Sequence, residues 1–104
     1  MAFAMLYTTH PDEATAKRIG HALVEERLAA CYNVLPIQSG FHWEEAFVND
    51  DEWVAILKTR TSLVDQLTAR FEALHPYEVP CCIHWEVNAN PAYERWIEEN
   101  TFSV

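Results

Sequence analysis

The centre of the chain, residues 31–59, reads CYNVLPIQSGFHWEEAFVNDDEWVAILKT. Its two apolar ends predict strands over Cys31–Trp43 and over residues 52–59. A largely polar connection over residues 44–51 separates the strands, and Asn49-Asp50-Asp51 is its strongest turn signal. We therefore expect a β-hairpin whose tip lies between residues 44 and 51. Pro36 has no amide hydrogen to donate, which indicates a sheet edge or a bulge in the first strand.

Before this hairpin, the pattern predicts a strand over residues 3–9 and a helix over 12–30. After it, the pattern predicts a helix that starts at a Ser62/Asp65 capping box and ends near His75, then a strand over 77–87 and a short helix after Asn90-Pro91. The order is β-α-β-β-α-β followed by an extra C-terminal helix. This order predicts the ferredoxin-like split βαβ sandwich of the α+β class.

Right-handed crossovers place both main helices of this fold on one face of a four-stranded antiparallel sheet. The other face is then bare, although its strands carry Trp43, Trp53 and Trp85. A bare apolar face of this size indicates an interface, so we expect a homo-oligomer.

The length and net charge of the chain limit the number of domains and the classes of binding partner. The chain has 104 residues, which suits a single domain over residues 1–104. Its 16 Asp and Glu against 7 Lys and Arg give a net charge of −9, so nucleic acid and anionic membranes are poor partners. Acidic surface attracts cations but also simply confers solubility. The stretch at 49–52 lacks the spacing of a calcium loop and is interpreted as a solvated loop.

Three cysteines occur, at Cys31, Cys81 and Cys82. An odd number cannot be fully paired within the chain, and the adjacent pair would be strained. Free thiols indicate a reducing compartment. Residues 1–6 have no basic region, and no apolar run approaches the roughly 18 residues of a membrane span. We therefore expect a cytoplasmic protein with no membrane association.

The last predicted strand carries candidate metal ligands. Strand alternation places Cys82, His84 and Glu86 on one face and Cys81 on the other. Neighbours on one face lie roughly 6.5–7 Å apart at Cα, so two of them can hold one ion by leaning together. Thiolate and imidazole suit Cu or Zn. The alternative is a half-buried strand on which Cys82 acts as a small hydrophobic residue.

The segment HPYEVP, residues 75–80, joins the second main helix to this strand. Pro76 and Pro80 stiffen it and fix the directions of His75, Tyr77 and Glu78. The segment either presents an imidazole and a carboxylate to a cleft or is a turn that aims the last strand. A cysteine nucleophile would need an imidazole and an oxyanion-binding group beside it, and core cysteines are far commoner, so we expect no enzyme.

Six blocks follow one another along nearly the whole chain: TTHPDE at 8–13, LAACYN at 28–33, SGFHW at 39–43, ILKT at 56–59, HPYEVP at 75–80 and PAY at 91–93. In this order they resemble the CutA family of divalent-cation tolerance proteins. The resemblance implies a compact homotrimer of ferredoxin-like subunits, similar to PII-type signalling proteins, with clefts between subunits. It also implies a non-catalytic role in tolerance of divalent metals, copper above all, and no organic cofactor.

The resemblance further implies site residues. His75 matches the family's His before Pro-Tyr and is the first candidate for a metal ligand. Thr8 and Leu74 stand where some relatives have Cys and His, and Cys81 stands where the family usually has Glu. We expect neighbouring soft ligands to substitute for the missing ones. The candidate metal ligands are therefore His75, Cys81, Cys82 and His84.

Six residues are candidates for lining a cleft: Thr8, Cys31, Trp43, Lys58, Tyr77 and Glu78. Two hypotheses follow. In the first, the chain is a trimeric metal-responsive protein without catalysis that binds copper or another divalent metal. In the alternative, it is a trimeric PII-like structural or signalling module that binds a small molecule or a protein partner at clefts between subunits.

Overall fold

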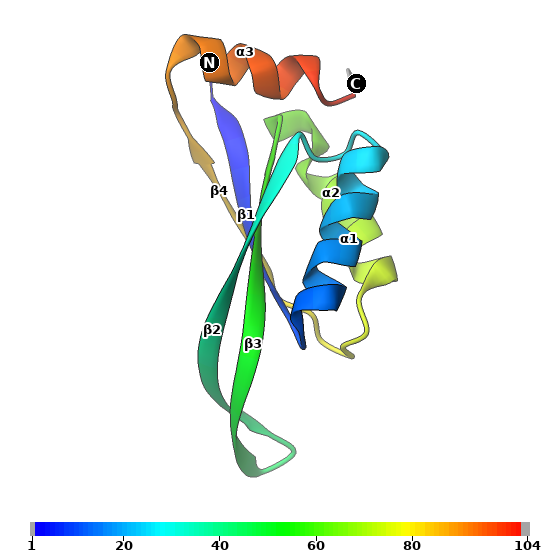
Figure 1. Ribbon diagram of the computed structural model, residues 1–104, viewed down its shortest axis with the longest axis vertical. Helices are drawn as coiled ribbons and strands as arrows, with labels where there is room; N and C mark the ends of the chain where they lie inside the picture. The colour runs from blue at the N-terminus through cyan, green and yellow to red at the C-terminus, as the bar shows by residue number, and fades with distance from the viewer. Residues whose placement is uncertain (1, 103–104) are drawn as a thin grey trace.

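The computed structural model describes residues 2–102 and contains a four-stranded sheet with helices packed on one face (Figure 1). The elements are β1 (Phe3–His10), α1 (Glu13–Glu25), β2 (Cys31–Trp43), β3 (Ala46–Thr59), the 3-10 turn η1 (Thr61–Leu63), α2 (Val64–Leu74), β4 (Cys82–Val87) and α3 (Pro91–Glu99). All strand pairs are antiparallel and the strand order is β2-β3-β1-β4. The predicted ferredoxin-like arrangement with an extra C-terminal helix is confirmed.

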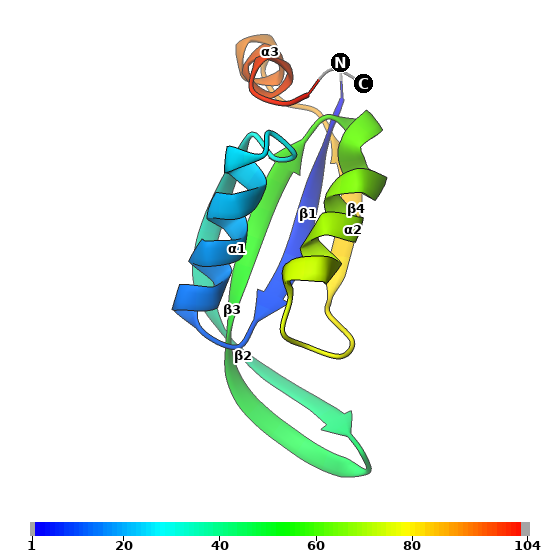
Figure 2. The same ribbon diagram turned by 90° about the vertical axis from the view of Figure 1, so that its right-hand side faces the viewer.

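The main core lies between the sheet and helices α1 and α2, which cover one face side by side (Figure 2). Leu23 of α1 and Phe71 of α2 are fully buried in the same cluster as Leu6 and Leu57 of the central strands. Burial of each such side chain contributes roughly 1.5–3 kcal/mol to folding. A smaller cluster around Ile97 seats α3 across one end of the sheet.

Strands β2 and β3 form a long hairpin that extends beyond the rest of the molecule (Figure 1). Its two-residue tip consists of Glu44 and Glu45, whose φ angles of 48° and 69° are those of a tight hairpin turn. This tip lies within the predicted range of residues 44–51. The strongest turn signal in that range, at residues 49–51, forms no turn, because cross-strand pairing continues without interruption through these residues of β3. β2 is an edge strand, which accommodates Pro36 without a bulge.

Helix α1 ends earlier than residue 30, where the sequence pattern placed its end. Arg27 adopts a φ of 61°, and the amides of Leu28 and Ala29 both turn back to the carbonyl of Leu23. This left-handed C-terminal cap satisfies the last free carbonyls and directs the chain into β2.

Two further predicted features are wrong. Ser62 and Asp65 form no capping box, because η1 precedes α2 and no side chain caps its first turn. The last strand begins at Cys82 rather than at residue 77. Pro76 and Pro80 lie in the preceding loop, where they cannot donate ladder hydrogen bonds.

The sheet face opposite α1 and α2 is uncovered within residues 2–102. Ile83 and Trp85 of β4 are 55% and 42% exposed, and Trp43 beside the hairpin tip is 43% exposed. The predicted bare apolar face is therefore present. Trp53 does not belong to it, because Trp53 lies opposite His10, whose ring packs against α2.

Candidate functional site

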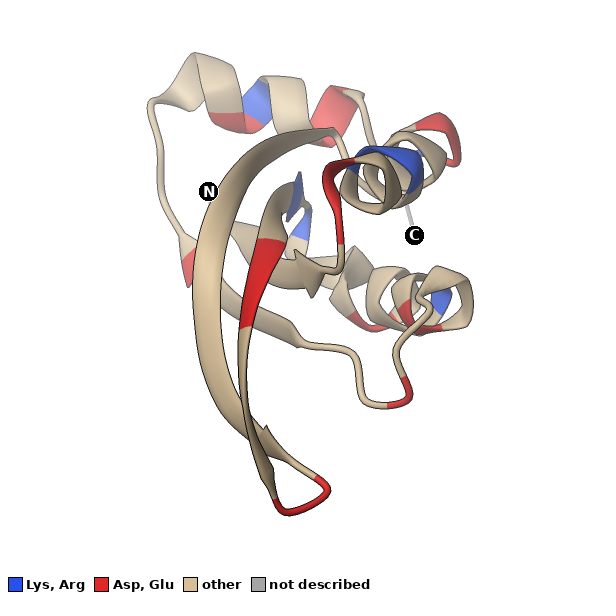
Figure 3. Cartoon of the chain, turned by 60° about the horizontal axis from the view of Figure 1, so that its bottom comes forward, with Lys and Arg blue, Asp and Glu red and all other residues tan. Residues whose placement is uncertain are grey.

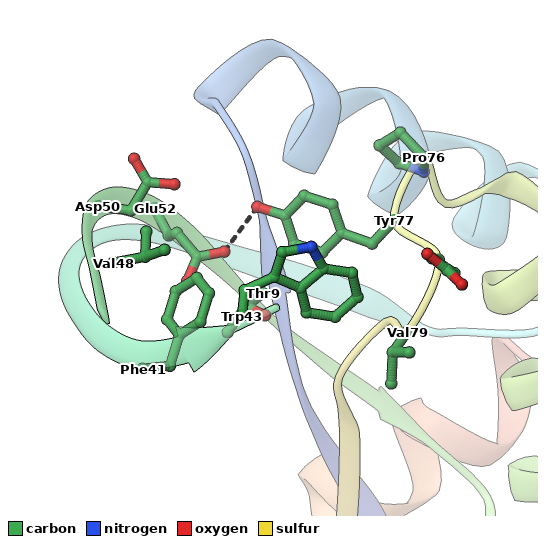
Figure 4. Close-up of a pocket in the computed structure, with 10 residues that line it drawn as sticks. Thr9, Phe41, Trp43, Val48, Asp50, Glu52, Pro76, Tyr77 and Val79 are labelled. Carbon is green, nitrogen blue, oxygen red and sulfur yellow. Dashed lines mark hydrogen bonds between the residues drawn. The ribbon is translucent and has the colours of Figure 1, made fainter. Parts of the chain in front are cut away.

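A cavity of about 580 Å3 lies between the distal half of the hairpin and the loop that follows α2 (Figure 4). Its lining combines aromatic, aliphatic and carboxylate side chains: Thr9, Phe41, Trp43, Val48, Asp50, Glu52, Pro76, Tyr77, Glu78 and Val79. The hairpin residues of this set share the open face of the sheet, because the alternation is continuous along β2 and β3. The hairpin bends toward the side on which the loop lies (Figure 2), and residues of both segments line the cavity.

A hydrogen bond ties the loop to the hairpin at this cavity. Tyr77 donates its hydroxyl to Oε2 of Glu52 at 2.6 Å (Figure 4). Glu52 is only 6% exposed although it carries a carboxylate. Burial, followed by the bond to Glu52 and the charge of its carboxylate, raises the pKa of Tyr77 well above its usual value. The hydroxyl therefore stays protonated and remains a donor at neutral pH.

His75 fixes the beginning of the same loop. Its Nε2 donates to the carbonyl of Thr9 at 2.7 Å, and its Nδ1 accepts from the amide of Tyr77 at 3.1 Å. The ring packs on those of His10 and Phe71, and burial lowers its pKa, so the imidazole is neutral near pH 7. Both ring nitrogens are engaged, and a metal ion reaches His75 only if one of these bonds breaks.

Thr8, which the sequence suggests as a cleft residue, lies fully buried in the core beside His10. Its hydroxyl donates to the carbonyl of Ala55 at 2.8 Å and accepts from Nε2 of His10 at 2.9 Å. Nδ1 of His10 is buried and has no hydrogen-bond partner in the part of the chain that the structure describes. Burial, followed by the neighbouring His75, lowers the pKa of His10 to about 4.

The four candidate metal ligands occupy separate places. Cys82 and His84 share the helix side of β4, as the alternation predicts. Sγ of Cys82 lies 3.8 Å from Oγ1 of Thr68, and burial raises the pKa of its thiol. Cys81 precedes β4, and His75 is held at the end of β1. Within residues 2–102, no group of three or more His, Cys, Asp and Glu side chains is placed to hold one metal ion.

Two of the cleft candidates, Cys31 and Lys58, lie at the end of the sheet that α3 covers. Nζ of Lys58 donates to the hydroxyl of Tyr93 at 3.1 Å, and Sγ of Cys31 lies 3.5 Å from the same oxygen. The bond to Tyr93 is the main cause of the raised pKa of Lys58. Of the six cleft candidates, the structure brings to the cavity Trp43, Tyr77 and Glu78.

Sequence reasoning missed the hairpin carboxylates of the cavity, Asp50 and Glu52. It interpreted residues 49–52 as a solvated loop because they lack the spacing of a calcium loop. The available signal was the alternation of Val48, Asp50 and Glu52, which becomes visible once the tip is placed at Glu44 and Glu45.

The fold and the site define a ferredoxin-like α+β protein with a long hairpin and a cavity of the size that holds small ligands. The sequence model described as CutA1 divalent ion tolerance protein matches residues 4–100. The chain therefore belongs to the CutA1 family, as the six blocks of sequence indicated. The family is described by tolerance of divalent ions and not by a reaction.

Relatives from bacteria and archaea match over nearly their whole length, whereas the chain spans 56% of the mouse and human CutA proteins. The divalent-cation tolerance protein CutA of Thermotoga maritima is 39% identical over 97 residues, which cover 92% of this chain and 96% of that protein. The crystal structure of CutA1 from Pyrococcus horikoshii has a TM-score of 0.93 at 38% identity, covering 96% of this chain and 99% of that chain. The periplasmic divalent cation tolerance protein CutA of Archaeoglobus fulgidus has a TM-score of 0.91 at 32% identity, covering 94% and 97%.

Among residues 2–102, no helix combines the length and the apolar character that crossing a membrane requires.

Proposed function

We propose that this chain acts as a homotrimeric, non-catalytic, metal-responsive protein in tolerance of divalent cations. The observation that carries the proposal is the family match over residues 4–100, together with relatives named for divalent-cation tolerance. A cytoplasmic location is part of the proposal and is supported by the three unpaired cysteines. Cell fractionation tests the location, since a relative from Archaeoglobus fulgidus is named periplasmic, and recovery of this chain from the periplasm would contradict this part of the proposal.

The trimer is supported by the open face of the sheet. Leu35, Ile83 and Trp85 are between 40% and 55% exposed there, and such a face is normally covered by a partner. Sedimentation should give a particle three times the 12.0 kDa of one chain. A stable monomer would contradict the proposal, because these side chains would then remain in water.

Copper or another divalent metal is the proposed ligand, and the pair of Cys82 and His84 fits it best. A thiolate and an imidazole on one face of β4 are the donors that Cu and Zn prefer. His75 fits less well, because its two nitrogens are already bonded. These two side chains fill only part of the coordination shell of a metal ion, so solvent supplies the remaining ligands in the proposed site.

Metal titration under reducing conditions tests this part. We expect saturable binding of Cu or Zn with a dissociation constant below about 10 μM. The variants Cys82→Ser and His84→Ala should each weaken it, whereas Glu99→Gln on α3 should not. Absence of saturable binding would reject direct metal binding and would leave the trimer standing.

A second candidate function is recognition of a small molecule, and the cavity beside Tyr77 specifically favours it. The cavity is lined by Phe41, Trp43 and Tyr77 and contains the buried carboxylate of Glu52. Apolar walls with a few fixed polar groups are typical of sites for small ligands. Thermal-shift measurements across metals and organic compounds separate the two functions, because only the second predicts stabilisation by an organic compound alone.

A further inference from the structure

We propose that the cavity between the hairpin and the loop after α2, which borders a neighbouring subunit in the proposed trimer, binds a protonated organic amine with an apolar body. The inference rests on the second candidate function above and names the chemical class of its ligand. It does not depend on metal binding.

The first argument is charge. Asp50, Glu52 and Glu78 line the cavity, and its lining includes no Lys or Arg. The sequence has no Lys or Arg over residues 32–57 or 71–94, which hold the distal hairpin and the loop. Figure 3 shows acidic positions on the hairpin and on this loop. A carboxylate or phosphate ligand would be repelled here, and a cation would be attracted.

The second argument is the state of Glu52. Its carboxylate is 6% exposed and its Oε2 accepts the hydroxyl of Tyr77. Its Oε1 accepts no hydrogen bond from residues 2–102 but is not enclosed, so this oxygen is open to the cavity. A buried carboxylate is costly unless it is paired. An ammonium group that enters the cavity would donate to this open oxygen in place of water and would bring the opposite charge next to the carboxylate.

The third argument is the aromatic lining. Phe41 and Trp43 come from the hairpin and Tyr77 comes from the loop, and Figure 4 shows the rings gathered around one space. Aromatic faces attract organic cations, most strongly where water is excluded. Val48 and Val79 add aliphatic surface that an apolar ligand body can cover.

The same features disfavour a bare metal ion as the occupant. A hard divalent cation needs about six or more oxygen ligands at short distance, and the described residues offer no group of three ligands for one ion. The volume of about 580 Å3 also far exceeds what one ion fills. An amine with a carbon skeleton uses the carboxylates and the rings together.

Isothermal titration of the purified, assembled protein at neutral pH tests the inference with three probes of similar size. These are 2-phenylethylammonium, the neutral 2-phenylethanol and the anionic 3-phenylpropionate. We expect the ammonium to bind, the alcohol to bind at least about tenfold more weakly and the carboxylate to show no binding.

Variants assign the binding to the cavity. Glu52→Gln should weaken ammonium binding at least about tenfold and leave the alcohol unchanged, because only charge is removed. Asp50→Asn removes an exposed charge and gives a second test if Glu52→Gln folds poorly. Trp43→Leu should weaken both ligands. Glu99→Gln and Trp96→Leu are matched controls on α3, since Trp43 and Trp96 are 43% and 40% exposed, and they should leave both affinities unchanged.

Two results would overturn the inference, and they are distinguishable. If the alcohol or the carboxylate binds as tightly as the ammonium in a Trp43-dependent manner, the ligand class is wrong and the small-molecule function stands. If none of the three probes binds, both the inference and the small-molecule function are rejected.

Discussion

Two buried imidazoles hold the residues around the cavity in place. His75 bonds to Thr9 and to the amide of Tyr77, and its ring packs against that of His10. His10 in turn donates to Thr8 in the core. The two bonds of His75 need a neutral ring with one protonated nitrogen, and burial lowers the pKa of both histidines. Their role in the single chain is therefore positional.

Stability should depend on pH through His10. Its pKa is about 4 in the folded chain and near 6.5 when unfolded, so the unfolded state takes up a proton first as the pH falls. The contribution of neutral His10 to the free energy of unfolding is fully present above pH 6.5 and is lost as the pH falls from 6.5 to about 4. Between pH 7 and pH 4.5, the free energy of unfolding should fall by about 2 kcal/mol less in His10→Gln than in the wild type.

Urea unfolding at both pH values and at one protein concentration measures this difference. His75 and the carboxylates are retained in His10→Gln, so their contributions are common to both proteins. His21 is exposed, so His21→Gln is the control. Its free energy of unfolding should change between the two pH values as much as that of the wild type. Equal slopes in His10→Gln and wild type would contradict the prediction.

Helix α1 packs on β2 at a glycine. A Cβ at Gly20 would lie 2.7 Å from Cγ of Tyr32, which is shorter than any normal contact. Gly20→Ala should therefore destabilise the fold by about 1–3 kcal/mol from overpacking, although alanine favours helix by about 1 kcal/mol. Denaturant unfolding measures the change, and adding Tyr32→Val should recover part of it. A more stable Gly20→Ala protein would contradict the close approach.

The position of the hairpin tip can be tested by substitutions that change stability. Glu44 and Glu45 both have positive φ, a conformation that costs energy for residues with a Cβ. Replacing the pair with Asn-Gly should stabilise the chain by about 1 kcal/mol. Asp50→Gly, at the position where the sequence suggested a turn, should instead destabilise it, because this residue lies within β3. A higher unfolding midpoint for Asp50→Gly would contradict this tip.

Much of this organisation could be predicted from the sequence. Apolar periodicity placed α2 and the start of β2 correctly because both depend on local patterns. The tip could not be placed in this way. Turn propensity favoured Asn49, whereas pairing along the whole ladder fixed the tip at Glu44 and Glu45. Of the cavity residues, the family resemblance supplied Tyr77, but Glu52 carries no local signal of its burial.

The whole molecule is elongated, with extents of 45 × 24 × 21 Å, because the hairpin projects from the sandwich (Figure 1). One face of the sheet is covered by α1 and α2, and the other exposes large apolar side chains. The apolar side chains of the uncovered face can be removed from water only by contact with another chain. Assembly would therefore bury apolar surface that the single chain leaves exposed.

A charge on the bare face should therefore disrupt assembly. Ile83 lies on this face and is 55% exposed in the single chain, whereas His84 points to the helix side of the same strand. Ile83→Glu should shift the sedimentation coefficient from that of the proposed trimer toward that of a monomer, because a buried unpaired carboxylate is costly. His84→Glu is the matched control and should keep the trimer. Unchanged assembly of Ile83→Glu would place the interface elsewhere.

The amino-acid sequence by itself determined the order of elements, the side of the sheet that helices cover and the family. These follow from periodicity and from short blocks, which are properties of neighbouring residues. Only the tertiary structure decided that Tyr77 bonds to Glu52, 25 residues away, and that His75 bonds to Thr9, 66 residues away. Such contacts depend on the register and bend of the hairpin, which arise from many cross-strand pairs at once. For the same reason, the cavity and its buried carboxylate emerge only when the chain is folded.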